Sequence, residues 1–242
     1  PQPVGWQSPF RPNGLHETMI RRIAPYSLRG FLYYQGEEDV QRYADYSDMM
    51  LMLVKQWRMD WNDWNLPFLF VQLPMYLADG EKDDSYWALQ REQQYIVSMM
   101  IQNAGMISLA DCGEYDNIHP LDKKTPGERL FQLAKNLVYD KQGTITATAA
   151  QLFSDNGKLY VTFDHLHEKL VMQTANGCPF EISGEDNLFY PAKADVTHGN
   201  MLCISNPAVK FPSAVKYAWY NFGEAVLFTE SGNPVSPFFK CV

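Results

Sequence analysis

The sequence predicts an α/β fold followed by a module of antiparallel strands, and two observations support this prediction. Over residues 28–140, short apolar runs alternate with segments in which apolar residues recur every three or four positions. Short runs are typical of buried strands and the longer spacing of amphipathic helices, so the alternation predicts a three-layer arrangement around a parallel sheet. After about Asp140 the helical spacing ends and short β-type runs follow. We therefore divide the chain into an α/β part, residues 1–140, and a β-rich module, residues 141–242.

The α/β part is expected to contain three strands and three main helices. In chain order these are a strand over 29–34, a helix over 39–61, a strand over 67–73, a helix over 85–100, a strand over 105–111 and a helix from about 125. Thr125 is the expected N-cap of the last helix, because Thr125-Pro126-Gly127-Glu128 has the pattern of a capping box. The strands expected in the β-rich module lie over 144–148, 158–163, 201–204, 215–220 and 225–229.

Composition and charge exclude several classes of function. The formal net charge of the 242 residues is −8, so no basic surface is available to hold the phosphates of a nucleic acid. The longest apolar stretch, residues 66–78, is interrupted by two prolines and is shorter than the roughly 18 residues that a membrane-spanning helix needs. His165 and His167 share one face of a β-type run but have no third ligand nearby. The sequence thus predicts no nucleic-acid partner, no membrane span, no metal and no cofactor.

Two polar loops follow predicted strands of the α/β part. Gln35-Gly36-Glu37-Glu38-Asp39 comes after the first strand, and residues 111–120 come after the third. Because parallel strands end at the same edge of a sheet, we expect the two loops to lie close together. A histidine near a carboxylate can act as a general base, and a glutamine amide beside a glycine can stabilise an oxyanion. The same residues also fit structural roles, since acidic residues are common at helix starts.

Several short motifs follow one another along the chain: Tyr34-Gln35-Gly36-Glu37, the run Phe68–Pro74, the run Leu89–Gln94, Ile118-His119-Pro120 and Gly127-Glu128-Arg129-Leu130. In this order they resemble the sialate O-acetylesterases, a branch of the SGNH ester hydrolases. The likeness covers residues 14–140, and the β-rich module resembles the family's C-terminal part. The resemblance implies a flavodoxin-like (SGNH) parallel sheet, of which this chain holds the later strands, so that residues 1–140 are the C-terminal part of the hydrolase domain.

The resemblance also implies a reaction, the hydrolysis of an O-acetyl ester on sialic acid or a related glycan. His119 would be the general base, which takes a proton from a serine and returns it to the sugar oxygen. Gln35 and Gly36 would form and shape the oxyanion site, and Glu37 would orient their loop.

The same resemblance implies roles for three further residues. Asp116 fits the Asp-x-x-His pattern of SGNH hydrolases and would orient the imidazole of His119. The order Asp116-Asn117 reverses the Asn-Asp order common in the family, however, and some relatives work with a Ser–His dyad. Arg91 and Trp87 are expected to line the substrate pocket, although both residue types also pack well inside proteins.

The family's nucleophile is missing from this chain. It lies in a Gly-Gln-Ser-Asn motif upstream of Gln-Gly-Glu, and no such motif occurs here. In the strand order 2-1-3-4-5 of this fold class, residues 28–140 alone would leave an apolar sheet edge exposed. We therefore expect a companion N-terminal chain of the same protein, without which the enzyme is inactive. Relatives are often exported, which implies a periplasmic or secreted location.

Two alternatives remain open at this stage. If no segment with a catalytic serine assembles with it, the chain is a non-catalytic carbohydrate-binding or incomplete esterase-like protein. A deacetylase of xylan is the second alternative, because related esterases share the same motifs. The sequence does not choose the acetylated sugar, since the pocket is formed partly by the missing segment.

Overall fold

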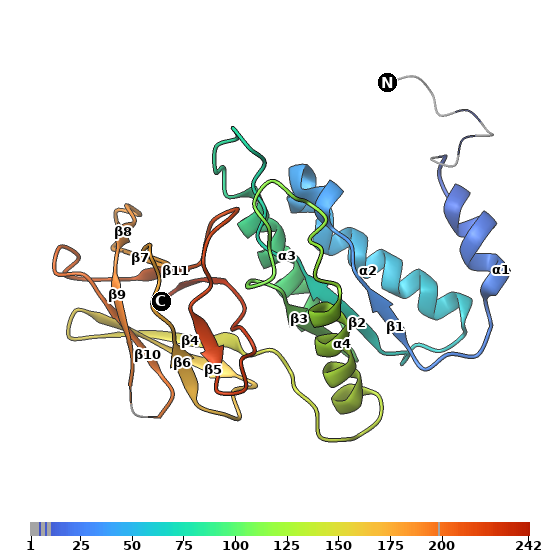
Figure 1. Ribbon diagram of the computed structural model, residues 1–242. Helices are drawn as coiled ribbons and strands as arrows, with labels where there is room; N and C mark the ends of the chain where they lie inside the picture. Colours follow the sequence, from blue (N-terminus) through green and yellow to red (C-terminus); the bar gives the residue numbers. More distant parts are fainter. Residues whose placement is uncertain (1–4, 6–7, 9–10, 198) are drawn as a thin grey trace.

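The computed structural model describes residues 5, 8, 11–197 and 199–242. Figure 1 shows the α/β part on one side and the β-rich module beside it, joined by a single extended segment after α4. The helices are, in chain order, η1 (His16–Ile20), α1 (Arg21–Ile23), η2 (Glu37–Arg42), α2 (Tyr43–Asp60), α3 (Tyr86–Met100) and α4 (Lys124–Leu137).

A parallel sheet forms the centre of the α/β part. Its strands β1 (Phe31–Tyr33), β2 (Phe68–Gln72) and β3 (Ala104–Ser108) lie in that order, so β2 is paired on both sides. Phe68 is in register with Phe31 of β1 and with Ala104 of β3. The three predicted strands are therefore confirmed, each shorter than expected.

Helices cover both faces of this sheet. Phe68 and Phe70 of β2 pack into a cluster with α2 and α3, whereas Leu69 and Val71 pack into a cluster with α4. Neighbouring side chains of a strand point to opposite faces, so a strand covered on both sides must be apolar at every position. This requirement explains the unbroken apolar run that marked β2 in the sequence.

The start of α4 differs from the prediction. The helix begins at Lys124, and the carboxylate of Asp122 accepts hydrogen bonds from the amides of Lys124 and Thr125, both at 3.0 Å. Thr125 is thus inside the first turn and is not the N-cap. An aspartate satisfies the free amides of a first turn as well as a threonine does and adds a favourable charge there. Hydrogen bonds from Thr125 accordingly lower the pKa of Asp122.

The β-rich module consists of antiparallel strands in two four-stranded sheets and one two-stranded sheet. The sheets have the orders β4-β5-β10-β9, β13-β11-β7-β8 and β12-β6. The strands are β4 (Thr148–Asp155), β5 (Lys158–Asp164), β6 (Leu170–Met172), β7 (Phe180–Ser183), β8 (Tyr190–Pro191), β9 (Lys193–Val196), β10 (Leu202–Ser205), β11 (Ala214–Tyr217), β12 (Leu227–Thr229) and β13 (Phe238–Cys241).

The module departs from the sequence prediction in its number of strands and in two details. The sequence predicts none of β6, β7, β8, β9 and β13, and the strand expected over 144–148 overlaps β4 only at Thr148. Residues 144–147 are not a strand: Thr146 passes the open edge of β3, where its hydroxyl accepts a hydrogen bond from the Ser108 amide at 3.2 Å. The pair His165 and His167 does not lie in a strand either, because β5 ends at Asp164 and His165 has a φ of 59°. A residue with positive φ ends the alternation that would place both imidazoles on one face.

The module packs directly on the carboxyl ends of β2 and β3. Its hydrophobic core includes Met75 and Ala110, which follow those two strands. The Ser236 hydroxyl donates a 3.0 Å hydrogen bond to the side chain of Gln72, and both residues are almost fully buried. Within the described residues, no helix has the length and apolar character needed to cross a bilayer.

Removal of the Tyr217 hydroxyl is expected to destabilise the β-rich module. This hydroxyl accepts hydrogen bonds from the amides of Val226 and Leu227 at 2.9 and 2.8 Å, and burial raises its pKa. Tyr217→Phe leaves two buried amides without a partner, so we expect the free energy of unfolding to fall by about 1–3 kcal/mol. Urea denaturation measures this loss, with Tyr139→Phe, at a half-exposed ring, as the control. Equal urea midpoints for the two variants contradict the prediction.

Candidate functional site

The carboxyl ends of the three parallel strands lie at one edge of the sheet, and the two predicted loops start there. Gln35 follows β1 by two residues, and Asp111 follows β3 by three. The segment after β2, residues 73–85, lies between them, because β2 is the central strand. This edge therefore carries the candidate functional residues.

The Gln35 side chain is held at both ends. The Tyr33 hydroxyl donates to Gln35 Oε1 at 2.9 Å, and Gln35 Nε2 donates to Asp39 Oδ2 at 2.7 Å. Burial together with the charges of Asp39 and Glu37 raises the pKa of Tyr33 to about 12, so this hydroxyl stays protonated as a donor. An amide nitrogen carries two N–H groups, and the contact with Asp39 uses one of them. Among the described residues, the second N–H group of Gln35 has no acceptor.

Gly36 is in a backbone conformation that requires glycine. Its φ is 147°, and a Cβ added there would lie 3.1 Å from Gln94 Nε2 and 3.2 Å from Gln90 Nε2. The loop backbone therefore rests on two buried glutamine amides of α3. Glu37, the next residue, is the first of η2 and is half-buried.

The two glutamines beneath Gly36 differ in their partners. Gln94 Oε1 accepts from the Leu73 amide at 2.8 Å and Gln94 Nε2 donates to the Val71 carbonyl at 3.2 Å. Gln90 is equally buried, but neither its Oε1 nor its Nε2 has a hydrogen-bond partner among the described residues. Gln94 thus fixes the backbone around the end of β2, and Gln90 does not.

The His119 loop is stabilised from within. The Glu114 carboxylate accepts from Asn117 Nδ2 and from the Leu121 amide, both at 2.6 Å, and Asn117 Oδ1 accepts from the His119 amide at 3.1 Å. The backbone on both sides of His119 is therefore fixed. The His119 side chain is exposed, and its ring makes no hydrogen bond within the described part of the chain.

Asp116 links this loop to the segment after β2. Its Oδ1 accepts from the Asp79 amide at 2.9 Å, and its own amide donates to the Leu77 carbonyl at 3.0 Å. The structure thus does not place the Asp116 carboxylate in a hydrogen bond with His119. The orienting role expected for Asp116 stays a prediction.

A small hydrophobic cluster brings the two loops together. Ile118, next to His119, packs against a buried group that includes Val40 of η2, with Tyr34 at its side. The ammonium of Lys123 lies 5.3 Å from the centre of the Tyr34 ring. The loops that carry Gln35 and His119 are therefore neighbours, as the sequence predicted from their places in the sheet.

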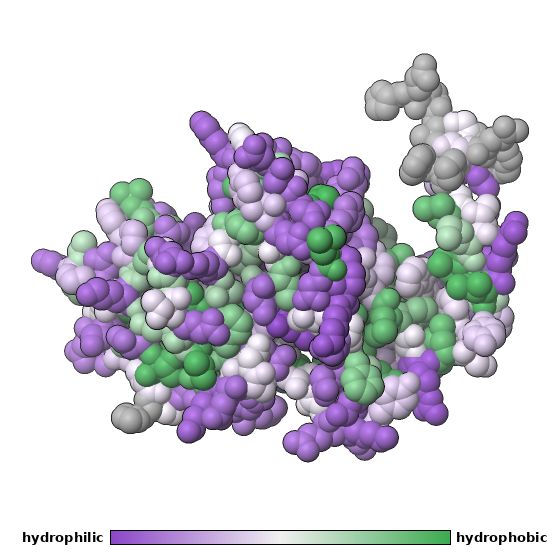
Figure 2. Space-filling view, in the orientation of Figure 1, coloured by the Kyte–Doolittle hydropathy of each residue, from purple (hydrophilic) through white to green (hydrophobic). Residues whose placement is uncertain are grey.

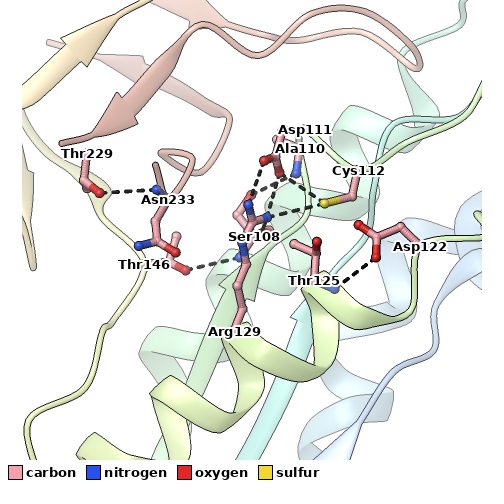
Figure 3. A network of polar contacts seen from close by, with 10 residues as sticks. All are labelled: Ser108, Ala110, Asp111, Cys112, Asp122, Thr125, Arg129, Thr146, Thr229 and Asn233. Atoms are coloured by element: carbon pink, nitrogen blue, oxygen red, sulfur yellow. Dashed lines mark hydrogen bonds and ion pairs between the residues drawn. The ribbon is translucent and has the colours of Figure 1, made fainter. Parts of the chain in front are cut away.

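An ion pair anchors the base of the His119 loop, as Figure 3 shows. The guanidinium of Arg129, from α4, makes two contacts with the Asp111 carboxylate at 2.6 and 2.7 Å, and it donates to the Ser108 carbonyl at 3.0 Å. Paired hydrogen bonds of this kind are strong and directional. Arg129 thereby fixes α4 to the end of β3, so both ends of the loop between them have defined positions.

Cys112 belongs to the same network but is a poor nucleophile. Its thiol lies 3.4 Å from Asp111 Oδ1 and 3.5 Å from Arg129. Burial and the Asp111 charge raise the pKa of Cys112 to about 12. The thiolate is the reactive form of cysteine, so this thiol is not suited to nucleophilic attack.

Arg91 and Trp87 lie beneath the edge and not on its surface. Arg91 is 1% exposed, and its guanidinium donates to the carbonyls of Pro74 and Tyr220; burial lowers its pKa to about 10. Trp87 is 6% exposed and its ring lies 5.1 Å from that of Tyr76. This placement favours structural roles for both residues over the expected lining of a substrate pocket.

Asn221 is a residue of the edge that sequence reasoning missed. It comes from the β-rich module, and its backbone amide and side-chain amide donate to Asp83 Oδ2 at 2.7 Å and Asp84 Oδ1 at 2.9 Å. Its Oδ1 accepts from the Trp87 amide at 3.0 Å. In the sequence it appears only as a turn-type residue before Phe222-Gly223, because its partners lie more than a hundred residues away.

The described residues offer no resident metal site. No group of three or more His, Cys, Asp or Glu side chains in this part of the chain is arranged to hold a metal ion. The polar groups at the edge are instead an imidazole, a carboxylate and amide donors. That set suits proton transfer and stabilisation of a negative oxygen.

Most of the chain is similar to known proteins. The family model for carbohydrate esterase, sialic acid-specific acetylesterase, matches residues 4–137, more than half of the chain. Sialate O-acetylesterase from Mus musculus is 27% identical over 260 residues, which cover 95% of this chain and 47% of the mouse protein. Sialate O-acetylesterase from Homo sapiens is 25% identical over 195 residues, 72% of this chain and 37% of the human protein.

A solved structure agrees with the fold. A crystal structure of a carbohydrate acetylesterase from Xanthomonas citri matches with a TM-score of 0.86 and 32% identity, over 93% of this chain and 53% of that chain. The chain therefore spans about half the length of the proteins that it matches.

The Gly36 conformation leads to a stability prediction. Gly36→Ala forces a Cβ against two buried amides at a φ that L-residues avoid, so we expect it to destabilise the protein by about 1–3 kcal/mol. Gly127→Ala is the matched control, because that position is helical and a Cβ there meets nothing within 4 Å. We expect Gly127→Ala to stabilise by about 0.5–1 kcal/mol. Thermal unfolding measures the stability of both variants. An unchanged stability of Gly36→Ala contradicts the strain expected for a side chain at this backbone conformation.

The glutamine pair beneath the loop leads to a second prediction. Gln94→Met removes the acceptor of the buried Leu73 amide, and we expect a loss of about 1–3 kcal/mol. Gln90→Met replaces an amide without partners by an apolar chain of similar length, and we expect a neutral or stabilising effect. Urea unfolding of the two variants separates these cases. Similar losses for both show that Gln90 is hydrogen-bonded in solution.

Proposed function

Because the chain belongs to the carbohydrate esterase family of sialic acid-specific acetylesterases, we propose that it takes part in removing O-acetyl groups from sialic acid or a related glycan. The observation that carries this proposal is the packing of the Gln35 loop against the His119 loop at one edge of the sheet. An imidazole and an oriented amide donor thus come from neighbouring loops. Ester hydrolysis needs both kinds of group.

In the proposed mechanism, a serine hydroxyl attacks the acetyl carbonyl carbon while the imidazole of His119 takes the hydroxyl proton. The free N–H of Gln35 and the backbone near Gly36 stabilise the negative oxygen that forms. His119 then gives the proton to the departing sugar oxygen. In the second stage His119 takes a proton from water, which attacks the acetyl-serine, and returns the proton to the serine oxygen as acetate is released. In this proposal Glu37 orients the loop and the Asp116 carboxylate orients the imidazole.

The serine is proposed to come from a segment outside these residues, a companion N-terminal chain of the same protein. The chain spans about half the length of these relatives, and among the described residues the thiol at the edge, Cys112, has a raised pKa. In this proposal β1, β2 and β3 are the later strands of a larger SGNH sheet that continues beyond β1. Leu32 of β1, which is 64% exposed, lies at that edge. Residues 1–140 are then the C-terminal part of the hydrolase domain, and residues 141–242 its β-rich module. We further propose that the protein works in the periplasm or outside the cell.

The composition of the active species tests the source of the serine. The protein is purified under native conditions, assayed for acetate release, and then analysed by denaturing intact-mass spectrometry. We expect the active fraction to contain serine-bearing polypeptide beyond the 27.8 kDa of this chain. Full activity from a single polypeptide of that mass contradicts the proposal.

The same active fraction identifies the substrate. Acetate release is measured with O-acetylated sialic acid and, separately, with acetylated xylan. The sialic acid carries a carboxylate, whereas the xylose units of xylan are neutral. We expect faster release from the sialic acid. Preference for xylan moves the assignment to deacetylation of a plant-wall glycan, and failure with both favours a carbohydrate-binding role without catalysis.

The role of His119 is tested by substitution. In the complete active protein, we expect His119→Ala to lower kcat by about 10²–10⁴-fold with KM nearly unchanged, the usual contribution of general acid–base catalysis. His167→Ala, at an exposed imidazole in the β-rich module, is the control and keeps the full rate. An unchanged rate for His119→Ala removes this residue from the mechanism.

A further inference from the structure

A second concave region lies on the β-rich module, apart from the edge that carries His119. It is a cleft of about 410 Å³, within the range typical of ligand pockets. Two loops form it, one between β7 and β8 and one between β10 and β11. The residues that line it are Gly184, Glu185, Asp186, Tyr190, Ala208, Val209, Lys210 and Phe211.

Two aromatic rings of this cleft face solvent. Phe211 is 83% exposed and Tyr190 is 38% exposed. Among the described residues neither ring contacts another aromatic ring, whereas Phe153, Phe163 and Phe189 of the same module each do. Exposed apolar side chains grouped on a polar surface commonly mark binding sites. Figure 2 shows such apolar atoms among hydrophilic ones at the outer end of the module, over the part labelled β8 in Figure 1.

Charged groups surround these rings without neutralising one another. Glu185, Asp186 and Lys210 are exposed, and none of them forms an ion pair within the described residues. One oxygen of Asp186 accepts from the Leu188 amide at 3.1 Å, which leaves its second oxygen and the Glu185 carboxylate as free acceptors. The cleft thus offers aromatic faces, hydrogen-bond acceptors and one cation, with a net negative charge.

The walls of the cleft are held in place before any ligand binds. In the first loop the Asn187 amide donates to the Gly184 carbonyl at 3.2 Å. In the second, Asn206 Oδ1 accepts from the Ala208 amide at 2.8 Å and its Nδ2 donates to the Pro191 carbonyl at 2.7 Å. The latter bond ties the second loop to β8. A site formed in advance loses little entropy when a ligand enters.

We propose that this cleft binds neutral pyranose units of a glycan, separately from the hydrolytic site. The C–H groups on one face of a pyranose carry partial positive charge and stack on the negative face of an aromatic ring. The sugar hydroxyls donate to the Glu185 and Asp186 carboxylates, and Lys210 donates to a ring or hydroxyl oxygen. Two carboxylates against one ammonium repel an acidic sugar, so the ligand is a neutral saccharide and not a sialic acid. This site would hold a polymeric or branched glycan while its acetyl groups are removed elsewhere.

Binding to the full chain tests this proposal without any catalytic assay. Isothermal titration with xylohexaose, a neutral oligosaccharide, is compared with sialyllactose, an acidic one. We expect xylohexaose to bind with a Kd of about 1 mM or below and sialyllactose to bind at least tenfold more weakly. Equal affinities, or no binding of xylohexaose, overturn the proposal. Because neither sugar carries an acetyl ester, this result is independent of whether the proposed esterase function holds.

Variants then locate the site. Phe211→Ala and Tyr190→Ala each remove a ring, and we expect each to weaken xylohexaose binding at least tenfold. Phe153→Ala, at a 40% exposed ring stacked on Tyr160 in the other sheet, is the matched control and keeps the affinity. The double substitution E185Q/D186N removes the charge and is expected to narrow the discrimination against sialyllactose. Binding that is unaffected by Phe211→Ala and Tyr190→Ala places the ligand elsewhere and overturns the assignment.

Discussion

The central constraint of this structure is the burial of β2 on all sides. The strand pairs with β1 and β3, all five of its residues are buried, and helices cover both faces. A polar group on such a strand reaches solvent only beyond its end. The parallel direction then places the ends of all three strands at one edge. The candidate functional groups therefore lie at this edge, because the loops that carry them begin at the ends of β1 and β3.

The β-rich module belongs to this edge as much as the helices do. Three consecutive residues of the module reach it: the Tyr220 carbonyl accepts from Arg91, Asn221 bonds to the segment before α3, and the Phe222 ring lies 5.6 Å from that of Tyr115. Tyr115 in turn donates to Asp79 at 3.1 Å. The position of the His119 loop therefore depends on both parts of the chain. A buried polar residue is favourable when its polar atoms have hydrogen-bond partners, and the backbone and side-chain polar atoms of Asn221 each have one.

Burial and negative charge at the edge determine which of its side chains stay protonated. Burial, together with nearby negative charge, raises the pKa of Tyr33, Tyr34 and Cys112 to about 12, so these groups stay neutral. Tyr33 donates to Gln35, and Cys112 donates to Asp111. The imidazole of His119 is exposed at the same edge. The edge thus combines an exposed imidazole and amide donors with a thiol that burial and the Asp111 charge keep protonated.

In the α/β part, the sequence by itself determined the order of strands and helices and the places of the two polar loops. It could do so because those features depend on local spacing: the apolar run Phe68–Gln72, the helical period of residues 43–60, and the motifs around Gln35 and His119. The sequence prediction was wrong at the cap of α4. Both Asp122 and Thr125 are suitable capping residues, and the sequence does not show that the helix begins at Lys124, where Asp122 caps it.

Only the tertiary structure decided which polar residues are buried. Arg91 and Trp87 read as pocket residues in the sequence, but packing places them beneath the edge. Gln90 and Gln94 look equivalent on one helical face, yet only Gln94 meets a backbone partner. The contact of Asn221 with residues 83–87 joins positions that no local pattern connects. Local spacing specifies the elements, whereas the partner of a buried polar group is set by a distant segment that arrives only when the chain folds.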